Sequence, residues 1–249
     1  MRVRTFATAD DAGRTLAREI ARALKTDSRL VLGLPTGRTP ILLYRELVRL
    51  YEAGRIDFSQ ATTFNLDEFF GLRAGDPRSY HAFMRRHLFD RVNLPARRIN
   101  FLNGAASDPE QECARYERAI ARAGGIDLQI LGLGGNGHIG FNEPADALMA
   151  ATHRARLTPA TRRANASLFG DRPRAVPREA LSMGMATILR ARRIILLATG
   201  RTKSRCVERM LGGPVTTRVP ASFLQLHPNV DVWLDRAAAS RLDRLPDLQ

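Results

Sequence analysis

The chain has 249 residues, of which 44% are hydrophobic, so it can bury one sizeable core and has the composition of a globular protein. It has no apolar run long enough to cross a bilayer and no apolar N-terminal segment of the kind that directs secretion, so we expect a cytoplasmic protein without membrane contact. Cys113 and Cys206 lack the spacing of a metal site and are expected to be free thiols.

The formal charge of +14 is compatible with nucleic acid, an acidic surface or an anionic small molecule as the partner. Arginines are spread along the chain, aromatic residues make up only 6%, and no helix-turn-helix or aromatic RNA motif accompanies the charge. We therefore expect no nucleic-acid partner. Arginine replaces lysine nearly everywhere, which indicates a general codon preference more than a function.

Apolar strand-like runs alternate with amphipathic helix-like runs along the chain. We expect strands over residues 29–34, 61–67, 98–102, 128–133, 193–198 and 230–234. We expect helices over residues 39–52, 79–89, 109–123, 179–189 and 203–211. This alternation predicts an α/β fold with an open, mainly parallel sheet and helices on both faces. Without repeats or linkers, residues 1–249 are expected to form a single domain, in which the weakly periodic segment 145–177 is an irregular excursion or a lid.

The first expected strand leads into a glycine-containing turn at residues 33–40. We expect Thr39 to be the N-cap of the next helix and Pro40 its first helical residue. Free backbone N–H groups and the helix dipole there suit a phosphate, to which Thr36 and Arg38 would add further donors. The same residues would also form an ordinary capped turn with a surface arginine.

Asp67 and Glu68 are adjacent carboxylates inside an otherwise apolar stretch, residues 64–72. Within a strand they would point to opposite faces, whereas at a strand end both can turn toward a cleft. Partial burial would raise the pKa of such a carboxyl and make it a competent base. The alternative is a helix N-cap followed by an exposed glutamate, and the apolar flanks favour the functional interpretation.

The expected strand 128–133 is followed by a glycine-dense turn that contains His138, with Glu143 five residues later. An imidazole can carry protons near neutral pH, and Glu143 could fix its tautomer. A lone histidine is more often structural, but its place after a buried strand favours catalysis. Lys203, at the start of a helix where a cation opposes the dipole, is typical of phosphate binding or is there by chance.

Together these segments resemble the glucosamine-6-phosphate deaminase family of amino-sugar isomerases/deaminases. The matching strings are Leu-Gly-Leu-Pro-Thr-Gly at 32–37, Phe-Asn-Leu-Asp-Glu at 64–68, Gly-His-Ile-Gly-Phe-Asn-Glu-Pro at 137–144, and Leu-Gln-Leu-His-Pro at 224–228. The third string is the most specific. The resemblance covers nearly the whole chain and implies a Rossmann-like fold that converts glucosamine 6-phosphate to fructose 6-phosphate and ammonia, with no metal or other cofactor.

The resemblance also implies roles for individual residues. Asp67 matches the base that takes the C2 proton and returns a proton at C1. His138 matches the residue that opens the pyranose ring, Glu143 matches its carboxylate partner, and Asn136 falls in the same ring-opening group. The positions expected to bind the substrate are Thr36, Gly37, Arg38, Thr39, Glu68 and Lys203.

One departure from the family concerns the phosphate. The family usually has an arginine where this chain has Ser167, and it usually has Gly or Ser where this chain has Arg38. We hypothesise that Arg38 supplies the missing guanidinium from the other side of the site. The alternative is that the substrate is a different amino-sugar phosphate.

A second departure concerns regulation. Members activated by N-acetylglucosamine 6-phosphate carry Ser, Arg and Lys where this chain has Asp146, His153 and Ala155, so we expect no such activation. Short members are often monomeric, which favours a monomer over a homo-oligomer. Two other functions remain open, a 6-phosphogluconolactonase-like hydrolase with the same fold and a sugar-phosphate-binding regulator without catalysis.

Overall fold

The computed structural model describes residues 1–242 of the chain. The strands of its main sheet are β1 (Arg2–Phe6), β2 (Val31–Leu34), β3 (Thr62–Asn65), β5 (Ile99–Asn100), β6 (Leu128–Gly132), β9 (Arg193–Ala198) and β10 (Val230–Asp235). Those of a second, smaller sheet are β4 (Asp67–Phe69), β7 (His153–Arg156) and β8 (Glu179–Ser182). The helices are α1 (Ala9–Thr26), α2 (Ile41–Glu52), α3 (Tyr80–His87), α4 (Pro109–Arg122), α5 (Pro159–Ala164), α6 (Met185–Leu189) and α7 (Ser204–Gly212).

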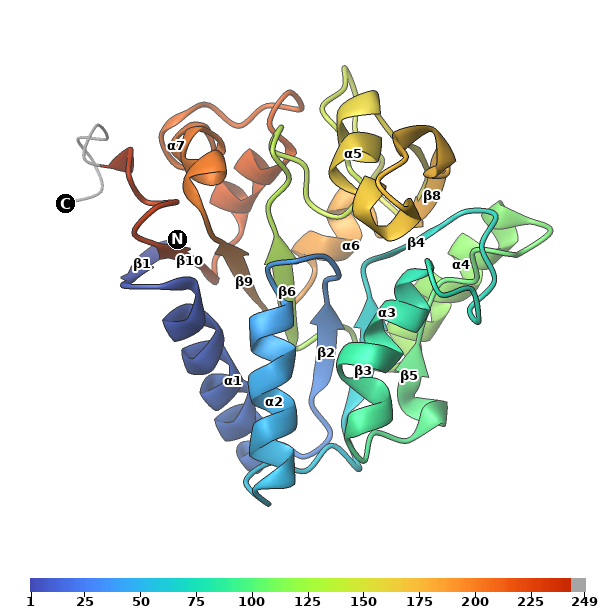
Figure 1. Ribbon diagram of the computed structural model, residues 1–249, viewed down its shortest axis with the longest axis vertical. Coiled ribbons are helices and arrows are strands. Elements are labelled where there is room, and N and C mark those ends of the chain that lie inside the picture. The colour runs from blue at the N-terminus through green and yellow to red at the C-terminus, as the bar shows by residue number, and fades with distance from the viewer. Residues whose placement is uncertain (243–249) are drawn as a thin grey trace.

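The main sheet has seven strands in the order β1-β10-β9-β6-β2-β3-β5, and all of its strand pairs are parallel (Figure 1). The chain runs outward from β2 to β3 and β5, and then returns to place β6 on the other side of β2. The order therefore reverses between β2 and β6. In open parallel sheets the loops at such a reversal leave a crevice at the carboxyl ends of the strands, which is where ligands bind.

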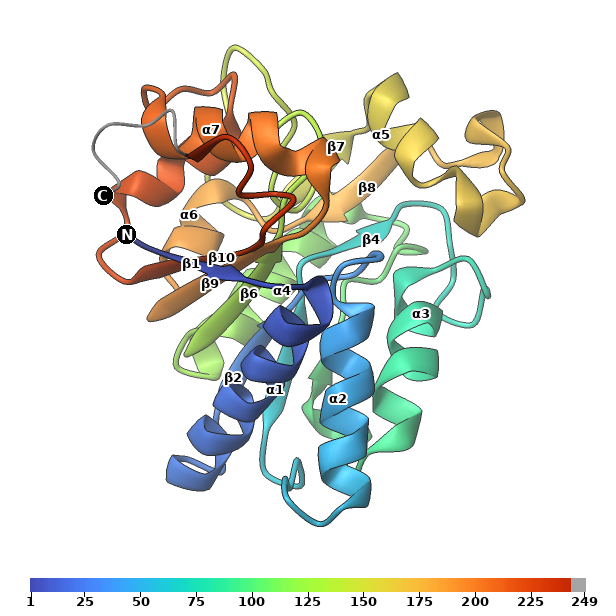
Figure 2. The same cartoon turned by 60° about the vertical axis from the view of Figure 1, so that its left-hand side comes forward.

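Helices cover both faces of this sheet, as the sequence predicts. α1, α2 and α3 pack on one face, and α4, α6 and α7 pack on the other (Figure 2). Along β9 the side chains alternate between the two cores, with Ile194 and Leu196 in one and Ile195 and Leu197 in the other. Burial on both faces is why these strands are continuous apolar runs in the sequence.

The second sheet lies over the carboxyl ends of the main strands. β4 and β7 flank β8, and both pairings are antiparallel. The segment 145–177 contributes β7, α5 and two short 3-10 turns, Ala166–Phe169 and Pro173–Ala175, and it packs on a third, smaller core. This segment is therefore an ordered layer above the crevice.

Several expected elements need correction. The expected helix over 179–189 is wrong in its first part, because Glu179–Ser182 form β8 and only Met185–Leu189 are helical. The expected strand over 61–67 is interrupted at Leu66, where the chain leaves the main sheet for the second one. In both places pairing with distant strands decides the local conformation. The elements β1, α1, β7 and α5 were not expected.

Glu117 of α4 ties the layer above the crevice to the main domain. Its Oε1 accepts hydrogen bonds from the Thr152 backbone N–H at 2.8 Å, the Thr152 hydroxyl at 2.6 Å and the Thr187 hydroxyl at 2.5 Å. Burial opposes the ionisation of Glu117, but these donors and Arg190 outweigh it, so the pKa of the carboxyl lies below its usual value. Thr152 precedes β7, so this contact fixes where the layer begins.

Replacing Glu117 by alanine is expected to lower the melting temperature, because three donors would lose their acceptor at a half-buried position. We expect a loss of about 1–3 kcal/mol, or roughly 2–4 °C for each kcal/mol, in thermal unfolding. The matched control is Arg118→Ala, an exposed neighbour on the same helix, which should change stability by less than about 0.5 kcal/mol. Equal melting temperatures for the two variants would contradict the anchoring role.

Candidate active site

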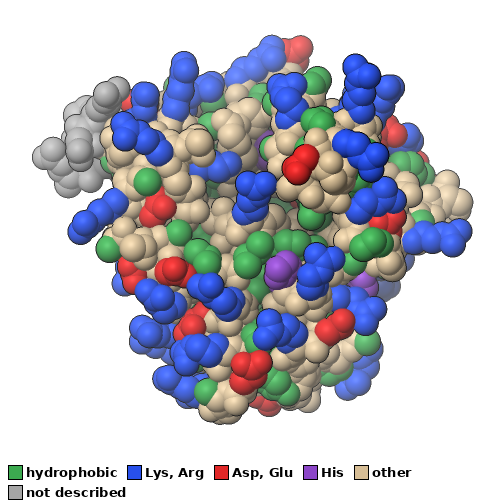
Figure 3. Space-filling view, in the orientation of Figure 1, with side chains coloured by type: hydrophobic (Ala, Val, Ile, Leu, Met, Phe, Trp, Pro, Cys, Tyr) green, Lys and Arg blue, Asp and Glu red, His purple; other side chains and the backbone are tan. Residues whose placement is uncertain are grey.

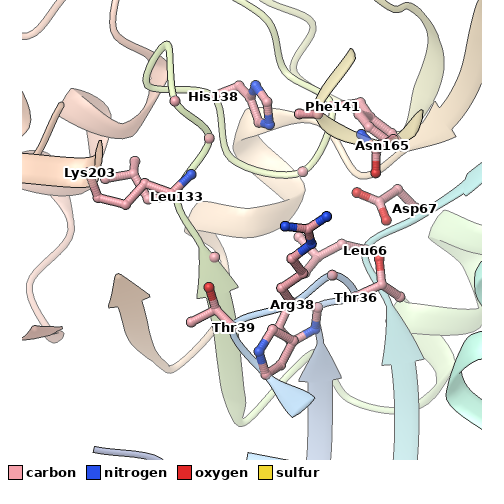
Figure 4. Close-up of a pocket in the computed structure, with 18 of the residues that line it drawn as sticks. Thr36, Arg38, Thr39, Leu66, Asp67, Leu133, His138, Phe141, Asn165 and Lys203 are labelled. Carbon is pink, nitrogen blue, oxygen red and sulfur yellow. The ribbon is translucent and has the colours of Figure 1, made fainter. Parts of the chain in front are cut away.

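A cavity of about 480 Å³ opens at the carboxyl ends of β2 and β6, where the strand order reverses (Figure 4). Its walls come from the loops after β2, β3, β6 and β9 and from the end of α5. Seven of the residues expected in the site line it, namely Thr36, Gly37, Arg38, Thr39, Asp67, His138 and Lys203. The other three, Glu68, Asn136 and Glu143, do not line the cavity.

Asp67 is the first residue of β4 and faces the cavity, on the side opposite Lys203 (Figure 4). Its side chain lies there because β3 ends at Asn65, and the chain passes through Leu66 from the main sheet into the second sheet. The residue is only 7% exposed. Burial, and to a smaller extent the charge of Glu68, raises the pKa of Asp67 to about 8. A carboxyl with a pKa near the working pH can both take up and return a proton.

Glu68 points away from the cavity, because successive strand residues face opposite sides. Its carboxylate accepts backbone N–H groups of Phe69, Tyr80 and His81, each at 2.9 Å, and so anchors the first turn of α3. Burial raises the pKa of Glu68 to about 7, although these three donors favour its charged form. The geometry gives no support to direct substrate binding by Glu68. It positions Tyr80, which does line the cavity.

His138 lines the cavity and forms one connected group with Asn136 and Glu143, which lie behind it. The His138 Nδ1 lies 3.5 Å from Glu143 Oε2, and Asn136 Nδ2 donates to that same oxygen at 2.7 Å. The Asn136 side-chain oxygen in turn accepts the His138 backbone N–H at 3.2 Å. Burial opposes ionisation of Glu143, but the neighbouring imidazole and amide outweigh it and lower the pKa of Glu143 to about 2. Glu143 is therefore ionised near neutral pH, and its carboxylate lies where it can fix the orientation of the imidazole.

Two glycines allow this loop to fold so tightly. A Cβ at Gly134 would overlap the His138 ring, so any other residue there would displace the imidazole. Gly137 has a φ of 94°, in the left-handed region that favours glycine. A hydrogen bond of 2.9 Å from the Gly134 N–H to the His138 carbonyl closes the turn. Gly134 and Gly137 are therefore steric requirements of the loop, whereas a Cβ at Gly132 or Gly135 would meet no other atom.

The cavity also has groups that are suited to an anion. Thr36, Gly37 and Thr39 come from the loop after β2, and Lys203 lies just before α7. Burial lowers the pKa of the Lys203 ammonium below its usual value, and an anion bound beside it would favour the charged form. Thr39 is not the N-cap of α2, because Pro40 takes that position, and the Thr39 side chain instead lines the cavity (Figure 4).

Arg38 reaches into the cavity from the loop after β2 (Figure 4). Ser167, the residue that stands where the family usually has an arginine, is exposed in a 3-10 turn and does not line the cavity. In the part of the chain that the structure describes, Arg38 is thus the arginine of the cavity wall.

Sequence reasoning missed Tyr80 and Asn165, which also line the cavity. The Tyr80 hydroxyl donates to the Asn165 side-chain oxygen at 2.9 Å, which joins α3 to the layer above the crevice. The signal for Asn165 was present, since it lies two residues before Ser167 in the segment compared with the family. Tyr80 carried no signal beyond its place after Ser79, the N-cap of α3.

No group of three His, Cys, Asp or Glu residues within 1–242 is placed to hold a metal ion. Both cysteines are free and buried, and Cys206 donates to the Gly135 carbonyl at 3.0 Å beneath the His138 loop. Across the described helices, none combines the length and the apolar character that a membrane span requires.

Comparison with known proteins identifies the family of the chain. Residues 4–233 match the family model described as glucosamine-6-phosphate isomerases/6-phosphogluconolactonase. A glucosamine-6-phosphate deaminase of Halothermothrix orenii is 54% identical over 219 residues, which are 88% of this chain and 90% of that protein. A second, of Rhodopirellula baltica, is 50% identical over 235 residues, which are 94% of this chain and 93% of that one.

Solved structures are also similar to this chain. A monomeric glucosamine-6-phosphate deaminase superimposes with a TM-score of 0.93 at 42% identity, over 96% of this chain and 99% of the other. The 6-phosphogluconolactonase of Trypanosoma cruzi has a TM-score of 0.75 at 20% identity, over 97% of this chain and 96% of the other, which is a likeness of fold alone. The chain belongs to the family of glucosamine-6-phosphate isomerases and 6-phosphogluconolactonases.

Proposed function

We propose that this chain is a glucosamine-6-phosphate deaminase, which converts glucosamine 6-phosphate and water to fructose 6-phosphate and ammonia. The observation that carries the proposal is that Asp67 and His138 line one cavity, which Lys203 and Arg38 also line. A base, a proton carrier and an anion site are the three parts that this reaction needs. The deaminases that are about half identical to this chain over most of its length support the same substrate.

In the proposed mechanism the sugar phosphate binds first. Its phosphate would accept the backbone and hydroxyl donors of the 36–39 loop and would pair with Lys203 and Arg38. The pyranose ring would then lie toward His138. With Glu143 holding its orientation, the imidazole would take the proton of the C1 hydroxyl and deliver one to the ring oxygen, which opens the ring to an aldehyde.

The open-chain aldehyde makes the C2 proton acidic, because the C1 carbonyl delocalises the charge that develops, and the step needs no cofactor. Asp67 would take this proton to give a cis-enolamine and return a proton at C1. The nitrogen at C2 is then an iminium. Water adds to C2 and ammonia leaves, which gives the ketose phosphate.

The lactonase alternative has no comparable support, since the 6-phosphogluconolactonases of similar structure are only 18–20% identical to this chain, which is a likeness of fold alone. A binding protein without catalysis would have no need of a buried base, or of an imidazole whose orientation a carboxylate fixes.

We also propose that the chain is a single domain in which residues 145–177 form a lid, because Ala164 and Asn165 of that segment line the cavity. We further propose a cytoplasmic monomer in amino-sugar breakdown, in line with the monomeric deaminase of similar structure.

Asp67→Asn should abolish ammonia release, because the amide cannot take the C2 proton. We expect the rate to fall about 100-fold or more in a coupled assay with glucosamine 6-phosphate. The control is Asp108→Asn, the same change at the N-cap of α4, where asparagine caps equally well and activity should persist. Full activity of the Asp67 variant would contradict the assignment. Galactosamine and mannosamine 6-phosphates, tested in parallel, decide which sugar is preferred.

The pH profile of kcat/KM should fall on the acidic side with a midpoint near the Asp67 pKa of about 8, because the base works only when ionised. Glu68→Gln removes a charge that raises this pKa, so it should move the limb to lower pH. The melting temperature of the variant shows whether α3 stays anchored. An acidic limb near pH 4, about where an ordinary carboxyl titrates, would argue against a buried base at this position.

Arg38→Ala should raise the KM for the sugar phosphate about 10-fold or more and leave kcat within about threefold, since a charged hydrogen bond is worth about 1.5–3 kcal/mol. The matched control is Arg45→Ala, an exposed arginine of α2 that pairs with Asp10 at the surface and should leave KM unchanged. An unchanged KM in the Arg38 variant would mean that the phosphate is held without this guanidinium.

A further inference from the structure

Helix α5 begins beside the carboxylate that lies next to the imidazole of the active site. The N-cap of α5 is Thr158, whose side chain accepts the Thr161 backbone N–H at 3.2 Å. The same hydroxyl donates to Glu143 Oε1, also at 3.2 Å. We propose that Thr158 is a positioning residue for the opening of the sugar ring, and that it acts by holding Glu143 in place beside His138. The inference rests on the proposed function and assigns Thr158 to one step of that reaction.

The two oxygens of the Glu143 carboxylate have separate partners. Oε2 accepts the Asn136 side-chain amide at 2.7 Å and lies 3.5 Å from His138 Nδ1. Within residues 1–242, Oε1 accepts hydrogen bonds from Thr158 alone, through its hydroxyl at 3.2 Å and its backbone N–H at 3.4 Å. A rotation of the carboxylate would therefore break the contacts of both oxygens together. Thr158 thus holds the oxygen that Asn136 and His138 do not bind.

Glu143 depends on neutral donors of this kind. Lys and Arg side chains are spread over the face of the molecule that Figure 3 shows, yet none within residues 1–242 forms an ion pair with Glu143. The Glu143 side chain is only 9% exposed, so water can replace a lost donor only in part. Without the Thr158 hydroxyl we expect the carboxylate to turn toward other donors and away from His138.

The Thr158 hydroxyl can serve the helix and the carboxylate at once. A hydroxyl has one proton to donate and two lone pairs that accept. One lone pair accepts the Thr161 N–H and so caps α5. The proton has two acceptors within reach, Glu143 Oε1 at 3.2 Å and the Thr161 hydroxyl at 3.3 Å, of which the charged oxygen is the stronger. Because capping and donation use different parts of the hydroxyl, a substitution can remove one and keep the other.

The substitution Thr158→Asp separates the two roles. Aspartate is an N-cap at least as good as threonine, because its carboxylate accepts the same backbone N–H. An ionised carboxylate has no proton to donate, and its charge would repel Glu143. Thr158→Ser keeps both capping and donation, whereas Thr158→Val removes both. A role in capping alone therefore predicts an active Thr158→Asp variant, and a role in positioning Glu143 predicts an impaired one.

The ring-opening step can be separated from the proton transfer by running the reaction in reverse. Fructose 6-phosphate, whose furanose ring opens in water unaided, condenses with ammonia and loses water to give the iminium at C2. Asp67 would remove a C1 proton to give the enolamine, exchange that proton with heavy water and return a deuteron. Hydrolysis of the iminium then releases ammonia and the labelled ketose. This exchange never forms the pyranose ring, so it does not need Glu143 to hold His138.

The experiment compares ammonia release from glucosamine 6-phosphate with deuterium uptake at C1 of fructose 6-phosphate in heavy water that contains ammonium chloride. Thr158→Asp should lower ammonia release about 10-fold or more and leave deuterium uptake within about threefold of the wild type. Thr158→Ser should keep both rates within about twofold. The matched control is Thr8→Asp at the N-cap of α1, where the hydroxyl also caps a helix and donates to a carboxylate, that of Asp11, away from the cavity. Both of its rates should stay unchanged.

Undiminished ammonia release by Thr158→Asp would overturn the proposal. An equal fall in both rates would also overturn it, because displacement of the whole layer above the crevice would give that result. If Thr158→Asp does not fold, Thr158→Val decides: it should lower ammonia release more than deuterium uptake, and rates equal to those of Thr158→Ser would contradict a role of the hydroxyl. The wild-type rate keeps the two claims apart, since a wild type that releases no ammonia would refute the proposed function itself.

Discussion

The site depends on a carboxylate that is kept out of water. Asp67 is 7% exposed, and the structure holds it there by ending β3 at Asn65 and starting β4, in another sheet, two residues later. This change from one sheet to the other directs the Asp67 side chain into the cavity and the Glu68 side chain toward the N-terminus of α3. Burial is unfavourable for a charged carboxyl, and this cost is what brings the pKa of Asp67 to about 8, the range a proton-transferring base requires.

The two acidic groups of the site have opposite environments. The pKa of Asp67 is raised by burial, while that of Glu143 is lowered to about 2 by His138 and its other partners, against the effect of its own burial. Because the two pKa values are shifted in opposite directions, the two carboxyls can have different roles. Asp67 can exchange a proton with the substrate, whereas Glu143 stays ionised. In the proposed reaction Asp67 moves a proton from C2 to C1 of the sugar, and Glu143 fixes the orientation of the His138 imidazole, which opens the ring.

The layer above the crevice links these parts. Thr158 holds Glu143, and Asn165 holds Tyr80, whose backbone is anchored by Glu68. Glu117 fixes the beginning of the same layer on α4. Motion of this layer would therefore change the surroundings of both Asp67 and His138, the two groups that transfer protons in the proposed reaction.

Much of the fold and of the candidate site could be predicted from the sequence. The parallel sheet and the loops around Asp67 and His138 carry local signals, namely apolar runs, glycines and polar residues at strand ends. The second sheet could not, because β4, β7 and β8 come from distant parts of the chain and their pairing overrides the helical pattern of 179–189. The direction of Glu68, the true N-cap of α2 and the role of Tyr80 likewise depend on tertiary contacts.

The most direct test of a single buried base follows the proton during the reaction. With the conversion run in heavy water, nuclear magnetic resonance of the fructose 6-phosphate should show deuterium at only one of the two C1 positions, because one carboxyl delivers it to one face of the enolamine. Deuterium distributed equally over both positions, or unchanged labelling in the Asp67→Asn variant, would contradict the account.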